Sequence, residues 1–254
     1  MKVKSLERVA PLLLLAIIIA IWQAICSLFS ISEFIFPSPI QIVHSLLELW
    51  RPIMGHAWRT FWTTMVGFGL SIAVGVVLGF IIGSSRMAYS AMYPLMTAFN
   101  ALPKAAFVPI LVVWFGIGIG PAILTAFLIS FFPIMVNIAT GLATLEPELE
   151  DVLRVLGARR LDVLIKVGLP RSMPYFFASL KVAITLAFVG TTVSEMNASN
   201  EGIGYLLISA GSAMKMPLAF AGLLVVAVMA MAMYELFSWI ERHTTAWAHR
   251  GQNG

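Results

Sequence analysis

Charged side chains are scarce in this 254-residue chain, in which Asp, Glu, Lys and Arg make up 11% of the residues. Soluble domains carry about 25% charged and about 45–50% apolar residues. Here the apolar share is 60% and the mean hydropathy is +0.94. A single soluble core cannot bury so much apolar surface. The composition therefore excludes a disordered chain and an ordinary soluble enzyme, and it predicts an all-α, polytopic membrane protein.

Residue types that carry covalent or metal chemistry are also few. Cys26 is the single cysteine, so no intrachain disulfide can form. No Gly-Lys pair occurs, so the chain lacks the phosphate-binding loop of an ATPase. The four histidines are scattered without the spacing of a metal site: His44, His56, His243 and His249. We therefore expect no enzymatic activity, no metal and no cofactor in this chain itself.

The few charged residues divide the chain into apolar windows of about 20 residues, the length that crosses a bilayer. We expect about six transmembrane helices. The third is expected to pass through Pro103, which lacks a backbone donor and should kink it. A cleavable signal peptide is the alternative for the first window. The expected spans are 11–29, a window between 59 and 86, a helix from near 89 to the glycine-rich break at 116–120, 122–142, 173–193 and 217–240.

Small residues repeat along one face of the second window. Gly75, Gly79 and Gly83 are spaced four residues apart, which places them on the same side of a helix. Glycines at this spacing allow a neighbouring helix to approach closely. The alternative is a lipid-facing helix that tolerates glycine. We expect this face to pack against another span.

The distribution of basic residues predicts the orientation in the membrane. With the N-terminus inside, the inner segments hold eleven Lys or Arg and the outer loops hold three, Arg51, Arg59 and Lys215. This asymmetry places both termini in the cytoplasm. The net charge of +4 is modest and gives no reason to expect a nucleic-acid partner. We therefore divide a single transmembrane domain, 1–254, into cytoplasmic tails at 1–10 and 241–254, a periplasmic segment at 36–58 and a cytoplasmic loop at 144–172.

The loop at 144–172 is polar, unlike the rest of the chain. Thr144 can cap a helix whose first turn is acidic, and Gly157 allows a sharp break after it. A second short helix is expected from about Leu161, ended by Pro170. Two amphipathic helices bent at a glycine form a projecting knob, for which we favour a protein-docking role. The alternative is a loop that lies on anionic lipid through its basic side chains.

The spacing within this loop resembles a motif of the permease subunits of ATP-binding-cassette (ABC) importers. That motif reads Glu-Ala-Ala, three residues, Gly, nine residues, then Ile-x-Leu-Pro. Here Asp151-Val152-Leu153, Gly157 and Val167-Gly168-Leu169-Pro170 stand at the same spacing. Asp replaces Glu, Val-Leu replaces Ala-Ala, and Val replaces Ile. The glycine and the Leu-Pro pair are intact.

Three further segments are similar to the same family. Residues 36–39, Phe-Pro-Ser-Pro, resemble its Leu-Pro-x-Pro element. The run 108–118 and the segment 195–206, which begins Glu-Met-Asn-Ala, resemble the subgroup that handles nitrate, taurine, sulfonates, bicarbonate, thiamine precursors and aromatic carboxylates. The resemblance covers roughly residues 35–240 and implies a type I permease fold with a cytoplasmic coupling helix.

The resemblance also implies a mechanism and partners. The chain would line the pathway of a small, anionic or aromatic solute in the bacterial inner membrane. A second permease copy, two cytoplasmic ATPases that bind ATP and Mg, and a periplasmic or lipid-anchored binding protein would complete the importer. An ATP-independent secondary transporter or channel is the alternative. The residues that would couple to the ATPase are Glu150, Asp151, Arg154, Gly157, Ala158, Arg159, Arg160, Leu169 and Pro170.

Polar residues within apolar spans are costly and usually face a bundle interior or water, so they are candidates for the pathway. Lys104 would attract an anion if it lines a cavity, and otherwise it marks a helix end. Glu195 belongs to a polar cluster that is either an outer gate or a solvated helix end. Asn137 is expected to hydrogen-bond between helices. The full candidate set is Asn100, Pro103, Lys104, Asn137, Thr191, Thr192, Glu195 and Asn197.

Overall fold

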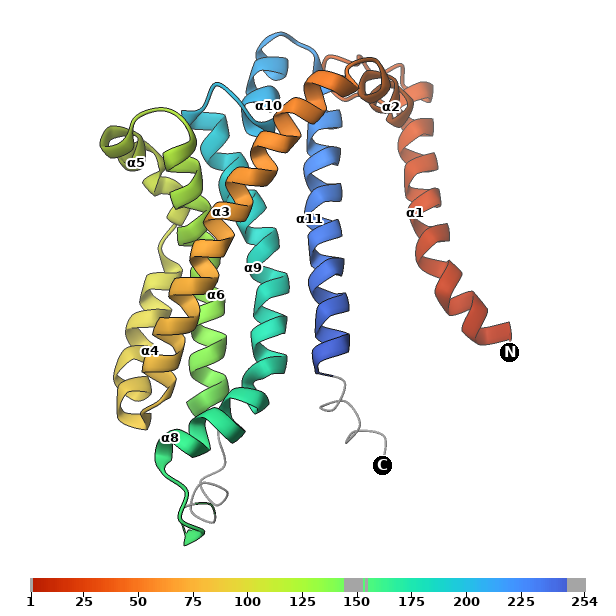
Figure 1. Ribbon diagram of the computed structural model, residues 1–254. Coiled ribbons are helices and arrows are strands. Elements are labelled where there is room, and N and C mark those ends of the chain that lie inside the picture. The colour runs from red at the N-terminus through yellow and green to blue at the C-terminus, as the bar shows by residue number, and fades with distance from the viewer. Residues whose placement is uncertain (1, 144–152, 154, 246–254) are drawn as a thin grey trace.

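The computed structural model describes residues 2–143, 153 and 155–245, and within them the regular structure is entirely helical (Figure 1). The elements are α1 (Lys2–Leu28), α2 (Pro39–Glu48), α3 (Trp50–Gly83), α4 (Arg86–Ala101), η1 (Lys104–Phe107), α5 (Val108–Phe115), α6 (Ile119–Ala143), α8 (Arg160–Val163), η2 (Leu164–Gly168), α9 (Leu169–Ala198), α10 (Ile203–Ser212) and α11 (Met216–Thr244). The predicted all-α class is confirmed.

Five of the described helices are long and apolar enough to cross a membrane, and the number is six if one bent pair is counted as a span. They are Ala10–Leu28, Trp50–Gly83, Ile119–Ala143, Ile165–Ala198 and Met216–Thr244. Five of the six expected spans are therefore recovered as single helices, and several of them are longer than the charge-free windows. Residues 50–58 of the expected periplasmic segment form the first turns of α3.

The third expected span is broken rather than kinked. Its two parts, α4 and the η1–α5 unit, are bent by 72°. Leu102 is extended, with ψ at 134°, because a residue before proline is disfavoured in the helical region. Pro103 then lacks the N–H that would continue the helical ladder. The break turns α5 across one end of the bundle, next to α6 (Figure 1).

The centre of the molecule is a packed group of α3, α6 and α9, joined on one side by α11 (Figure 1). Its largest cluster of buried apolar side chains draws on all three helices and includes Phe68, Ile134 and Phe188. Helix α1 lies at the edge of the molecule. It contacts α2, and its Trp22 ring lies 6.4 Å from the ring of Phe220 in α11.

The glycine face of α3 packs against α6, as the sequence predicts. A Cβ added at Gly79 would lie 2.7 Å from the carbonyl oxygen of Met135, and one at Gly83 would lie 2.8 Å from that of Ala139. Gly75 likewise leaves room for Ile134. The backbones of the two helices approach closely only because these positions carry no side chain.

Candidate functional site

The described part of the knob, residues 155–172, lies at one end of the bundle, and α2, α5 and α10 lie at the opposite end (Figure 1). We call the end that carries the knob the inner end and the end that carries α10 the outer end, in keeping with the orientation expected from the basic residues. Two groups of polar or exposed residues stand out, one at each end of α9.

Gly157 forms the turn of the knob. Its φ of +87° lies in the left-handed region, which L side chains rarely adopt. The N–H of Ala158 donates to the carbonyl of Leu153 at 3.0 Å, the bond that closes a helix C-terminus around such a glycine. The predicted break at Gly157 is confirmed. The side chains of Val155 and Leu156 are 88% and 77% exposed, so the turn presents apolar surface outward.

The second part of the knob runs without interruption into a membrane span. Helix α8 continues through the π-helical turn η2 into α9, so the expectation that Pro170 ends a helix is wrong. Pro170 lies in the first turn of α9, directly after the π-helical turn η2. Leu169, next to it, begins α9. The knob and α9 therefore form one continuous lever.

Part of the predicted coupling segment falls outside the described residues. Glu150, Asp151 and Arg154 are not described, and neither is the Arg160 side chain. Arg159 is exposed at the turn. A hollow of about 320 Å³ beside it is lined by Leu153, Leu156, Gly157, Ala158, Asp162, Val163, Lys166 and Val167.

A buried carboxylate joins three helices at the outer end. The Glu195 side chain on α9 is 2% exposed, so the alternative of a solvated helix end is wrong. The Thr60 hydroxyl on α3 donates to it at 2.8 Å, and the N–H of Gly204 in α10 donates at 3.0 Å. The Thr60 oxygen also accepts the N–H of Ile203 at 2.8 Å. We call Thr60, Glu195, Ile203 and Gly204 the outer junction.

Two glycines make room for the outer junction. A Cβ at Gly202 would overlap the Glu195 carboxylate, and one at Gly204 would overlap the backbone carbonyl of Thr192. Gly202 also has a φ of +96°. The carboxylate lies at the N-terminus of α10, where backbone donors are free and a negative charge is favourable. The turn between α9 and α10 is thus built around the buried Glu195 carboxyl group.

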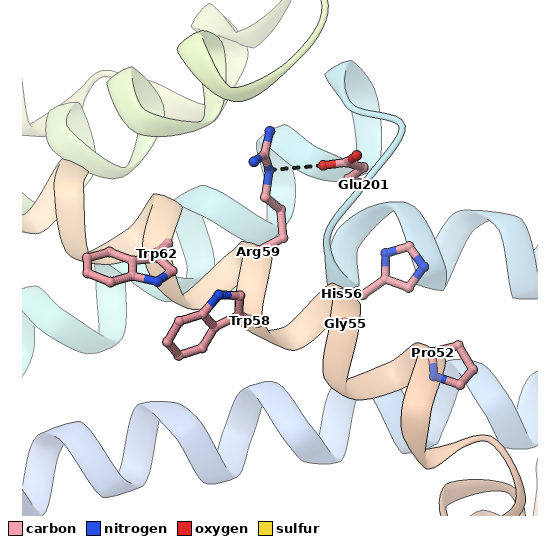
Figure 2. A pocket seen from close by; sticks show the side chains of 7 residues that line it. All are labelled: Pro52, Gly55, His56, Trp58, Arg59, Trp62 and Glu201. Atoms are coloured by element: carbon pink, nitrogen blue, oxygen red, sulfur yellow. Dashed lines mark ion pairs between the residues drawn. The ribbon is translucent and has the colours of Figure 1, made fainter.

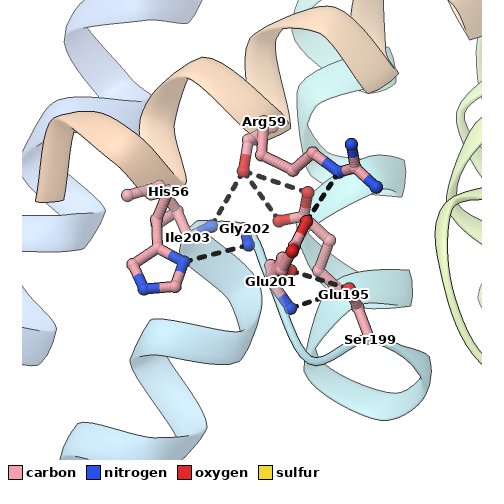
Figure 3. A network of polar contacts seen from close by, with 8 residues as sticks. His56, Arg59, Glu195, Ser199, Glu201, Gly202 and Ile203 are labelled. Carbon is pink, nitrogen blue, oxygen red and sulfur yellow. Dashed lines mark hydrogen bonds and ion pairs between the residues drawn. The ribbon is translucent and has the colours of Figure 1, made fainter. Parts of the chain in front are cut away.

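A second layer of contacts holds the same turn from outside. The Nδ1 atom of His56 accepts the N–H of Gly202 at 3.1 Å, and the Nε atom of Arg59 lies 3.1 Å from a carboxylate oxygen of Glu201 (Figure 3). These side chains, with Trp58 and Trp62, line a cavity of about 460 Å³ at the outer part of α3 (Figure 2). Arg59 and Glu201 are 46% and 62% exposed, so their pair contributes little to stability.

The sequence-predicted residues near Glu195 do not form one cluster. Thr191 accepts a hydrogen bond from Thr64 of α3 at 2.9 Å, which makes a second polar link between these helices. Thr192 instead donates to the carbonyl of Phe188 in its own helix. Asn197 is exposed and donates to the carbonyl of Val193. Of the predicted set, the structure therefore places Glu195 and Thr191 at the contact between α3 and α9.

Asn137 does not bridge helices, contrary to expectation. Its side-chain amide donates to the carbonyl of Pro133 at 2.8 Å, within α6. This carbonyl lies one turn back, where a helical N–H would normally bond. The residue therefore satisfies its own helix, and the described residues give it no contact that indicates a pathway role.

Lys104 lies at the break between α4 and α5. Its Nζ atom donates to the carbonyl and to the side-chain oxygen of Asn100, at 3.0 and 3.1 Å. It also lies 5.4 Å from the ring centroid of Phe132. Pro103 precedes it and sets the break. Lys104 and Asn100 therefore lie together on the surface of the chain, at the break in the third span.

Sequence reasoning missed Thr60, His56 and Glu201 as members of the outer end of the site. One signal was available, since His56, Arg59 and Thr60 fall on one helical face at spacings of three and four. Nothing in their local sequence indicates that this face meets the turn after α9. Thr60 and its partner Glu195, for example, are 135 positions apart in the chain.

Comparison with known proteins gives consistent results. Residues 71–246 match the model of the family described as binding-protein-dependent transport system inner membrane component. A probable ABC transporter permease protein of Haemophilus influenzae is 30% identical, over 98% of this chain and 100% of that protein. The formylaminopyrimidine transport permease protein ThiX of Halalkalibacterium halodurans is 30% identical, over 80% of this chain and 81% of that protein.

Among solved structures, the MetNI methionine ABC transporter in an inward-facing conformation has a similar fold. The TM-score is 0.67 with 16% sequence identity, and the match covers 78% of this chain and 98% of the matched chain. At this identity the likeness concerns the fold alone.

Proposed function

Because this chain belongs to the family of inner-membrane components of binding-protein-dependent transport systems, we propose that a partner ATPase drives it to import a small solute by alternating access. The chain is an ABC permease subunit with a type I importer fold. In the proposed cycle, the ATPase binds the knob and the spans rock between inward-open and outward-open states. The permease itself performs no covalent chemistry.

One observation carries this proposal most strongly: α9 connects the two ends of the molecule. It continues from the knob without interruption, and its far end carries Glu195 into the outer junction. A helix of this length is stiff and spans the bilayer. A displacement at Leu169 therefore reaches the three-helix contact at Thr60. This arrangement supports a lever that opens or closes the outer end in response to the ATPase.

The proposed complex contains two permease copies, two ATPases that bind ATP with Mg, and an outer binding protein. Two copies around a two-fold axis would place the pathway on that axis. The proposed location is the bacterial inner membrane, with both termini in the cytoplasm. The eleven-to-three distribution of basic residues supports this orientation.

We propose a small organic or anionic solute. The relative from Halalkalibacterium halodurans is named for formylaminopyrimidine, a small polar organic molecule. Lys104 supplies a cation at the break of the third span, and the buried hydroxyls of Thr60 and Thr64 lie nearer the outer end. If the break faces the two-fold axis, Lys104 favours solutes with a carboxylate, sulfonate or nitrate group.

The test is co-purification of the ATPase with two matched variants. Gly157→Arg places a long cation at the turn of the knob, where the backbone also disfavours a side chain. Gly211→Arg is the control, because a Cβ there meets nothing within 4 Å and the residue lies in α10 at the other end. We expect the wild type and Gly211→Arg to retain the ATPase and Gly157→Arg to lose it.

The same preparations distinguish the alternative of a secondary transporter or channel. In proteoliposomes, the proposal requires solute uptake to depend on both ATP and the outer binding protein. Uptake that proceeds without ATP, and that is unchanged by Gly157→Arg, would favour the alternative.

A further inference from the structure

A second polar contact between helices involves the membrane-spanning part of α9. The Nζ atom of Lys181 lies 2.6 Å from a carboxylate oxygen of Glu241 on α11. The two side chains are 18% and 14% exposed. The Nζ atom of Lys181 also lies 5.9 Å from the ring centroid of Tyr234. Tyr234 and Glu241 lie on the same face of α11, so this face supplies both contacts. This pair joins the lever helix to the last span of the chain.

Charges at such a position are costly. Ionisable side chains in apolar spans must be desolvated, and they persist only when they are paired or face water. A buried ion pair is seldom more stable than a well-packed apolar pair of the same volume. Packing alone therefore does not account for Lys181 and Glu241, because Leu or Met would join the helices as firmly.

The pair differs from the contacts around it in being directional. Met233, Phe237 and Ile240 of α11 pack against the buried apolar cluster that α3, α6 and α9 form together. Apolar surfaces of this kind can slide by small amounts at little cost, since dispersion contacts are individually weak. A charge-assisted hydrogen bond of 2.6 Å is lost when the two helices are displaced beyond the reach of the Lys181 side chain. The pair therefore limits how far α11 can shift relative to α9.

The pair is also well placed along the lever. Glu195 and Lys181 lie fourteen positions apart on α9, which corresponds to about 21 Å along a helix. The outer junction holds one end to α3 and α10, and Lys181 holds the part nearer the knob to α11. Among the described residues, α11 does not continue directly from the knob as α9 does. It can therefore follow a movement of the knob only through its contacts with other helices.

We propose that the Lys181–Glu241 pair makes α11 move with α9 as one unit, so that the displacement from the ATPase reaches the last span. Both are positioning residues, and the inference rests on the proposed function. Without the pair, α9 moves and α11 lags behind it. ATP is then hydrolysed with less solute moved.

The experiment compares four variants in the full complex in proteoliposomes. Lys181→Met and Glu241→Gln each leave one partner unsatisfied. The double variant Lys181→Met/Glu241→Leu replaces the pair by apolar side chains of similar size. The swap Lys181→Glu/Glu241→Lys restores opposite charges. Glu48→Gln, which removes a 63% exposed carboxylate from α2, is the control.

The informative quantity is the amount of solute imported per ATP hydrolysed. We expect the apolar double variant to match the wild type in melting temperature and in ATPase binding, as apolar replacement of buried pairs permits. Its import per ATP should fall by about fivefold or more, whereas the swap should recover most of it. Wild-type import per ATP in the apolar double variant would overturn the proposal, since the pair would then contribute packing alone.

A distance measurement tests the motion directly. Spin labels at Val189 of α9 and Met231 of α11, both exposed, are introduced after Cys26→Ser removes the single native cysteine. In the wild-type background we expect one narrow distance that is the same with and without trapped ATP. In the apolar double variant the distance should broaden or change. A wild-type distance that itself changes with ATP would refute the rigid link, whereas a wild-type complex without ATP-driven uptake would refute the proposed function instead.

Discussion

The Thr60 hydroxyl lies 2.8 Å from the nearer carboxylate oxygen of Glu195, across 135 positions of sequence. The same hydroxyl accepts the backbone N–H of Ile203 at 2.8 Å. One small side chain on α3 thus bonds to both α9 and α10. Because each of these groups is buried, none has water available as a substitute partner.

Thr60→Val keeps the shape of this side chain and removes the hydroxyl. The Ile203 N–H and one side of the Glu195 carboxylate then lose their partner, which should lower the free energy of unfolding by about 1–3 kcal/mol. Thr60→Ser retains the hydroxyl and should cost less. Denaturant unfolding in detergent measures both. Equal stability of the two variants would show that the hydrogen bonds contribute nothing net.

Gly79→Ala tests the close approach of α3 and α6. The added Cβ would lie 2.7 Å from the Met135 carbonyl oxygen, so the helices must separate. We expect a loss of about 1–3 kcal/mol in the free energy of unfolding, the usual cost of overpacking. Gly69→Ala is the matched control on the same helix, where the Cβ meets nothing within 4 Å. A control variant that loses as much as Gly79→Ala would contradict the packing explanation.

Gly157 separates backbone strain from steric clash, because a Cβ there meets nothing within 4 Å although φ is +87°. Gly157→Asn should bind the ATPase nearly as well as the wild type, since Asn tolerates the left-handed region. Gly157→Val should bind it about tenfold more weakly, because a β-branched residue is strained there by about 1–2 kcal/mol. Surface plasmon resonance with the purified ATPase gives both affinities. Tight binding by the Val variant would mean that the turn need not keep this conformation.

Lys104→Met tests whether the break in the third span faces the solute. If it does, removal of the cation should raise the KM for anionic solutes by about tenfold or more, since a single-sign site concentrates its ligand electrostatically. Lys104→Arg should retain uptake, and ATPase binding should be unchanged in both variants. Uptake is measured with a panel of carboxylates, sulfonates and nitrate. A Met variant with unaltered kinetics for every anion in the panel would remove Lys104 from the pathway.

Much of the fold was available from local sequence. Hydropathy located the spans, because the bilayer sets the length of each apolar window. The four-residue spacing of Gly75, Gly79 and Gly83 predicted a close helix contact, and Gly157 predicted the turn of the knob. Each of these features depends on residues within a few turns of one another. Their physical causes are therefore contained in a short stretch of chain.

Proline was interpreted less well. Pro103 was expected to kink a helix and instead accompanies a 72° break, and Pro170 was expected to end a helix and instead lies in the first turn of α9. A proline removes one donor, which is compatible with a kink, a break or a helix start. The neighbouring helices decide among these outcomes, and they are not contained in the local sequence.

The sequence by itself determined that the chain is a helical membrane protein, where five of its spans lie and that the chain turns at Gly157. Only the tertiary structure decided that Glu195 is buried against Thr60 and that Lys181 pairs with Glu241. Hydrophobic length and turn conformation follow from each residue and its near neighbours. A hydrogen bond between helices depends on which two faces meet. Which faces meet is decided by the packing of the whole bundle, because many pairings of apolar faces are nearly equal in energy. The buried polar groups select the pairing in which their hydrogen bonds are satisfied.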